Sequence, residues 1–238
     1  MPHYLEEILM SKESTAVARW KRFLGISLLC STAALALQAC MPTVIIGGGV
    51  AGTMAASDRR TFGTQTEDRT IGFKGESVAD SIVGSQGHVN VTSFNRMVLI
   101  TGEVPNEGMK TRVASEVKQI PNVRNIINEL EIAAPSSLSS RSSDSLITAK
   151  VAASFLNTSG LYANSIKTVT ERGNVYLMGR VTEREGNLSA EVARAVPGVL
   201  RVIKVFEHIS EEELDQMKAQ DVSAAEATRS DQDGEEYR

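Results

Sequence analysis

Two stretches of this chain, 77 residues apart, carry nearly the same strand sequence. Residues 98–104 read VLITGEV, and residues 175–181 read VYLMGRV. Further along, IPNV at 120–123 matches VPGV at 196–199 with an offset of 76. Self-similarity at a fixed spacing indicates one supersecondary unit used more than once. The chain is therefore predicted to hold two similar small domains rather than one large one.

Each unit is predicted to run strand, tight turn, strand, helix, strand, with a further helix in front. Arg172-Gly173 is the clearer hairpin turn, because glycine supplies the positive φ that a short turn needs, and Asn95-Arg96 is its counterpart. A proline after each central helix ends that helix and precedes the last strand. The expected strands are residues 89–93, 97–103 and 123–132, then 166–170, 174–180 and 199–209.

The order αββαβ favours an α+β fold, in which each three-stranded sheet packs on two helices. We expect the first domain at 73–133, a Ser-rich linker at 134–142 and the second domain at 143–209. Domains of about 60 to 65 residues have marginal cores, so the two are expected to stabilise each other by packing. Residues 210–238 hold ten acidic and three basic residues, which predicts an acidic disordered tail.

The amino-terminal region has the pattern of an export signal. Basic residues within 19–22 precede an apolar run at 23–37 that ends in small residues. That run is too short for a comfortable membrane span. We expect a signal peptide at 1–39, and Met10 is an alternative start that gives a more typical signal length.

The stretch LQAC at 37–40 resembles the bacterial lipobox, in which cleavage precedes the cysteine and the cysteine carries the lipid. We therefore expect lipidation at Cys40 and a Gly/Ala/Thr-rich tether at 40–72. Met41, rather than Asp, implies sorting to the outer membrane under the enteric pattern. An uncleaved anchor helix, or an ordinary signal peptide with an incidental cysteine, is the alternative.

A glycine motif follows the cysteine. Gly47, Gly49 and Gly52 satisfy the G-x-G-x-x-G spacing with which backbone amides hold a dinucleotide pyrophosphate. Dinucleotide binding also requires a second strand that ends in an acidic residue about 20 residues after the motif. Residues 57–68 are polar and do not form such a strand pattern. The motif is therefore predicted to be part of the tether, and no cofactor is expected.

The paired V-x-L-x-G-x-V strands and the tract ERGNVYLMGRVTERE at 171–185 resemble the BON domain. Two such domains behind a lipobox resemble the dual-BON outer-membrane lipoproteins, a family that includes the division- and outer-membrane-stress-associated lipid-binding proteins. The resemblance covers about 58–209, whereas a short, Gly-interrupted leading helix at 73–83 and the acidic tail depart from it. It implies a lipid-anchored protein on the periplasmic face of the outer membrane that binds anionic phospholipid through its second domain, without catalysis.

The leading helix of the second domain, expected at 144–156 after a cap at Ser143, has two apolar sides. Ile147, Val151 and Phe155 form a column that should face the sheet. The opposite arc is the predicted phospholipid-binding stripe, and it consists of Leu146, Ala149, Lys150, Ala153 and Leu156. Eight basic and five acidic residues between 143 and 206 suit an anionic membrane. The alternative is that the stripe packs against the first domain or a second subunit.

Side chains that could serve in catalysis or metal binding are scarce in this sequence. The only histidines are His3, His88 and His208, and they lack a nearby nucleophile or metal-ligand spacing. We expect no enzyme activity, no metal, no small-molecule substrate and no nucleic-acid partner. The predicted function is a non-enzymatic envelope lipoprotein that binds anionic phospholipid and supports outer-membrane integrity. The alternative is an interaction module that docks an envelope protein or self-associates through the same helix.

Overall fold

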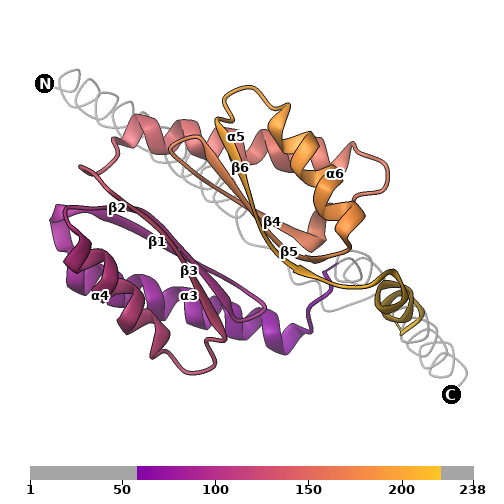
Figure 1. The fold of residues 1–238 in the computed structure, drawn as a ribbon, viewed down its shortest axis with the longest axis horizontal. Coiled ribbons are helices and arrows are strands. Elements are labelled where there is room, and N and C mark those ends of the chain that lie inside the picture. The colour runs from indigo at the N-terminus through magenta and orange to yellow at the C-terminus, as the bar shows by residue number, and fades with distance from the viewer. Residues whose placement is uncertain (1–57, 221–238) are drawn as a thin grey trace, which may run out of the picture. The chain divides into compact units, whose positions relative to one another are not determined.

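A computed structural model of the protein describes residues 58–220 (Figure 1). The chain divides into two compact units at residues 51 and 52, and every described residue belongs to the second unit. This unit contains two three-stranded sheets, each in an αββαβ element order. The predicted α+β fold with two tandem domains is confirmed.

The two domains repeat the same topology. In each sheet, the first two strands form an antiparallel hairpin and the third strand pairs in parallel with the second. The first domain consists of α3 (Phe62–Val83), η2 (Gly84–Gln86), β1 (His88–Phe94), β2 (Met97–Val104), α4 (Glu107–Lys118) and β3 (Asn125–Ile132). The second consists of α5 (Leu138–Leu156), η3 (Ala163–Ser165), β4 (Ile166–Glu171), β5 (Asn174–Val181), α6 (Glu183–Arg194) and β6 (Arg201–His208).

Both predicted hairpin turns are confirmed. The central residues of the first, Asn95 and Arg96, have φ values of 50° and 64°. Those of the second, Arg172 and Gly173, have φ values of 51° and 73°. Two consecutive left-handed residues match the twist of the flanking strands, which is why these short turns suit antiparallel hairpins.

Each sheet is buried on both faces. In β5, Val175 and Leu177 face the helices of their own domain, while Tyr176 and Met178 face the other way. The outward residues of both sheets meet in one apolar cluster, formed by Phe94, Leu99, Tyr176, Met178 and Val205. The expected packing of the two domains on each other is therefore confirmed, and it is made by the sheets rather than by the helices.

Helix α3 is longer than the sequence predicted. It begins at Phe62 rather than at residue 73, and the Thr61 side chain caps it by accepting a hydrogen bond from the Thr64 amide at 3.2 Å. The glycines that weakened the prediction allow close packing, since a Cβ on Gly75 would lie 2.5 Å from Val91 Cγ1. The expected tether bound at residue 72 is accordingly wrong, because residues 62–72 are helical.

Two other expected boundaries are also wrong. The cap of α5 is Ser137 rather than Ser143, so most of the expected linker is helix. The hydroxyls of Ser142 and Ser145 donate to carbonyls one turn back and so are satisfied within the helix. The next helix of this domain, α6, starts with a complete capping box formed by Thr182 and Glu185. The start of the acidic tail is helical over 211–220, where Leu214 is buried and Glu213 pairs with Arg180 at 2.6 Å.

Candidate membrane-binding surface

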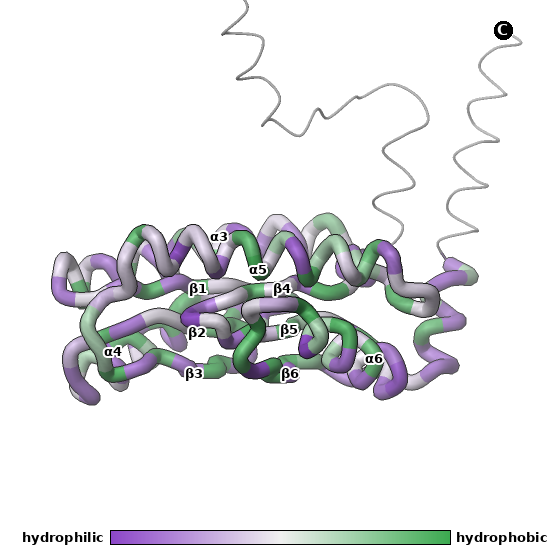
Figure 2. Tube along the Cα trace, turned by 90° about the horizontal axis from the view of Figure 1, so that it is seen from above, coloured by the Kyte–Doolittle hydropathy of each residue, from purple (hydrophilic) through white to green (hydrophobic). Residues whose placement is uncertain are grey.

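Helix α5 has the two-sided arrangement that its sequence predicts. Ile147, Val151 and Phe155 are at most 8% exposed and belong to the core of the second domain. On the opposite side, Leu146 is 62% exposed and Leu156 is 73% exposed. Ala149, Lys150 and Ala153 are exposed as well. Figure 2 shows apolar and polar positions interleaved along this helix.

The exposed stripe is not used for contact between the domains. The first domain meets the second through the apolar cluster between the two sheets, which includes Leu99 and Tyr176. Because α5 covers the other face of its sheet, its outer side points away from that cluster. The alternative in which the first domain covers the stripe is therefore wrong for residues 58–220.

A buried carboxylate fixes α5 on its sheet. Asp144 accepts hydrogen bonds from the backbone amides of Arg172 and Gly173 at 2.9 and 2.8 Å, which ties the helix to the hairpin turn. Asp68 does the same in the first domain for the amides of Asn95 and Arg96. Sequence reasoning missed both residues, although their spacing of 76 matches the offset of the repeat.

An aromatic residue follows the stripe. Tyr162, in the loop after α5, is 45% exposed. The Arg59 guanidinium lies 5.5 Å from its ring centroid, and the Lys218 ammonium lies 5.9 Å from it. Tyrosine rings, which have an apolar body and a polar end, are enriched at interfaces between water and membrane. The sequence analysis did not identify Tyr162.

The segment that leads towards Cys40 is attached to the second domain. Cys40 and the glycine motif at 47–52 lie outside the described residues. Arg59 donates to both carboxylate oxygens of Glu185 and to the Arg180 carbonyl, at 2.6 to 2.7 Å. Thus the chain crosses to the second domain before it enters α3 of the first.

The charge state of Glu185 follows from these contacts. Burial opposes its charged form, but hydrogen bonds from Arg59 and from the Thr182 amide outweigh that effect and hold the pKa of Glu185 below its usual value. The carboxylate is therefore ionised at neutral pH and completes both the ion pair and the capping box of α6.

Within the part of the chain that the structure describes, His88 and His208 show no catalytic arrangement. His88 contacts Asn90 at 3.2 Å, and burial together with the charge of Arg141 lowers its pKa. His208 is exposed at the end of β6. Among residues 58–220, no three His, Cys, Asp or Glu side chains are grouped to hold a metal ion. Within the same range, no helix has the length and apolarity needed to cross a membrane.

Comparison with known proteins identifies a domain family and two similar proteins. The family model of the BON domain matches residues 76–134 and 143–208. The outer membrane lipoprotein DolP of Haemophilus influenzae is 36% identical over 179 residues, which cover 74% of this chain and 92% of that protein. The 21 kDa hemolysin of Actinobacillus pleuropneumoniae is 31% identical over 157 residues, 64% of this chain and 79% of that protein.

A solved structure of CdsD, a structural protein of the type III secretion system of Chlamydia trachomatis, aligns with 60% of this chain and 96% of its own. Its TM-score is 0.25 and its sequence identity is 10%.

Proposed function

We propose, since this chain belongs to the BON domain family and carries two BON domains, that it is a non-enzymatic lipoprotein of the bacterial outer membrane that binds anionic phospholipid. In this proposal, Cys40 carries the lipid anchor and the exposed stripe of α5 contacts the membrane. The relative named outer membrane lipoprotein DolP supports the location. The lipobox-like stretch at 37–40 supports the anchor. The role is to support outer-membrane integrity from the periplasmic face.

The observation that carries the proposal is the exposure of Leu146 and Leu156 on one side of a helix whose other side is fully buried. Transferring a leucine side chain out of water contributes about 1.5 to 3 kcal/mol. Two such residues with alanines between them give a modest affinity, which Lys150 supplements by attraction to negative headgroups.

The lipid anchor would allow the stripe to stay bound to the membrane despite this modest affinity. Acyl chains on Cys40 would hold the protein at the bilayer, where the effective concentration of the stripe is high. The ion pair between Arg59 and Glu185 supports the same arrangement, because it joins the anchor side of the chain to the domain that bears α5.

The competing function is docking of an envelope protein, or of a second copy, on the same stripe. The mixed composition of the stripe favours lipid, since the lysine that it contains would lose hydration in an apolar protein interface. A membrane interface instead leaves the ammonium group in the headgroup layer.

Vesicle flotation separates the two functions. The chain from Gly52 onward keeps the whole second unit and lacks the apolar export segment. We expect it to float with vesicles that contain phosphatidylglycerol, to float less with phosphatidylcholine alone, and to lose binding as salt rises. Absence of flotation together with a dimer in sedimentation equilibrium would replace lipid binding by self-association.

A further inference from the structure

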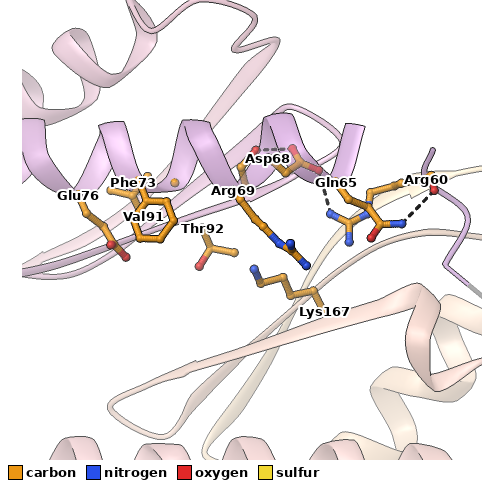
Figure 3. Close-up of a pocket in the computed structure, with 11 residues that line it drawn as sticks. Arg60, Gln65, Asp68, Arg69, Phe73, Glu76, Val91, Thr92 and Lys167 are labelled. Carbon is orange, nitrogen blue, oxygen red and sulfur yellow. Dashed lines mark hydrogen bonds and ion pairs between the residues drawn. The ribbon is translucent and has the colours of Figure 1, made fainter. Parts of the chain in front are cut away.

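A cavity of 340 Å³ lies where the first domain meets β4 of the second (Figure 3). Helix α3 contributes Arg69, Phe73 and Glu76, and β1 contributes Thr92. The second domain contributes Lys167 from β4. None of these residues belongs to the stripe on α5, so this cavity is separate from the proposed membrane contact.

Two cations from different domains point into the same space. Figure 3 shows the guanidinium of Arg69 and the ammonium of Lys167 directed towards each other. Within residues 58–220, neither group forms an ion pair or a hydrogen bond with a protein side chain or backbone atom. Two facing like charges repel, so a negative ion between them would lower the energy of this arrangement.

The neighbouring carboxylates do not neutralise the charges of Arg69 and Lys167. Asp68 is already saturated, because it accepts hydrogen bonds from Arg60, Ser93 and the amides of the hairpin turn. Glu76 is the remaining carboxylate of the cavity lining, and it balances at most one of the two cations. Lys167 is an exposed residue, but partial desolvation of its ammonium group and the charge of Arg60 lower its pKa, while Asp68 and Glu76 oppose this only in part.

We propose that this cavity binds the phosphate group of a small polyol phosphate or of a phospholipid headgroup. A guanidinium fork and an ammonium group are the side chains that hold phosphate oxygens best. Thr92 also lines the cavity, and its hydroxyl adds a polar group to the lining. The volume accommodates a glycerol phosphate as well as a bare ion, and Phe73, which is 74% exposed, provides an apolar edge for the carbon skeleton.

Calorimetric titration of the chain from Gly52 onward, at low ionic strength, tests the site with inorganic phosphate and with glycerol phosphate. We expect saturable binding with one site per chain. Lys167→Gln and Arg69→Gln should each weaken it about tenfold or more, because each removes a charge-assisted hydrogen bond. Lys204→Gln is the matched control, since Lys204 is exposed and bonded to Asn187, and it should leave the affinity unchanged.

The two titrants distinguish the sources of the phosphate group. Tighter binding of glycerol phosphate, displaced by short-chain phosphatidylglycerol below its micelle concentration, assigns the site to a lipid headgroup. Equal affinity for inorganic phosphate assigns it to a free phosphate. Absence of saturable binding, or binding that survives the Lys167→Gln, Arg69→Gln double variant with unchanged melting, would overturn the proposal. Leu146→Glu should not alter phosphate binding, so a failure of the membrane stripe is detected separately.

Discussion

Arg59 donates two hydrogen bonds, of 2.6 and 2.7 Å, to the carboxylate of Glu185, which lies 126 residues further along the sequence. Both side chains are at least nine-tenths buried. The same carboxylate accepts the Thr182 amide at 3.0 Å and so completes the capping box of α6. One ion pair thus joins the segment that precedes α3 to the first turn of a helix in the second domain.

Arg59→Ala should destabilise the second domain by about 3 to 5 kcal/mol, because it leaves Glu185 buried without its partner. Urea unfolding of the chain from Gly52 onward measures this. Arg184→Ala is the control, since that residue pairs with Glu211 on the surface at 3.7 Å and its loss should cost about 1 kcal/mol or less. Equal effects of the two variants would show that the buried pair adds nothing beyond a surface pair.

The same pair predicts a pH dependence. The pKa of Glu185 is lower in the folded protein than the ordinary value of 4.5, so its contribution to stability is present above pH 4.5 and is lost as the pH falls through the folded pKa. Unfolding free energies measured between neutral and acidic pH should decline in that window. Glu185→Gln should flatten this decline, and an unchanged pH profile in that variant would contradict the assignment.

Asp144→Ala should lower the stability of the second domain by about 2 kcal/mol, since the buried amides of Arg172 and Gly173 lose their acceptor. The exposed Asp215, whose only described contact is with Lys218, provides the control substitution Asp215→Ala. Thermal melting of both variants checks the difference. If Asp144→Ala melts like wild type, the carboxylate does not hold α5 on its sheet.

Cys40→Ala should abolish lipid labelling in cells, because the lipobox-like stretch ends at that residue. Incorporation of radiolabelled palmitate is the measurement, and the protein should become soluble or remain an unprocessed precursor. Cys30→Ala is the matched control and should leave labelling intact. Palmitate incorporation that persists in Cys40→Ala would exclude Cys40 as the lipidated residue.

The repeated strands and turns could be predicted from the sequence because they depend on local patterns. The strand pairs around Asn95-Arg96 and Arg172-Gly173 follow from alternating apolar residues and turn propensity. The two sides of α5 also follow from helical spacing, since Ile147 is buried and Leu146 is exposed.

Contacts between distant segments could not be predicted in this way. Gly75 weakens a helix by propensity, yet its lack of a side chain lets α3 approach Val91. Arg59 lies before α3 and Glu185 lies in the second domain, and no spacing rule relates them. The cavity between Arg69 and Lys167 likewise exists only once the two sheets have packed. Tertiary packing, rather than local propensity, determines each of these features.

The central claim is that α5 binds anionic membranes through its exposed stripe, and vesicle flotation of Leu146→Glu and Leu156→Glu tests it most directly. Each carboxylate should stay solvated in the free protein but must be desolvated beside negative headgroups when the helix binds. Leu200→Glu is the control, because Leu200 is 75% exposed and lies outside α5. We predict that both stripe variants melt like wild type and lose flotation with phosphatidylglycerol vesicles, while Leu200→Glu floats normally. Stripe variants that float as well as wild type, with unchanged melting, would contradict the account.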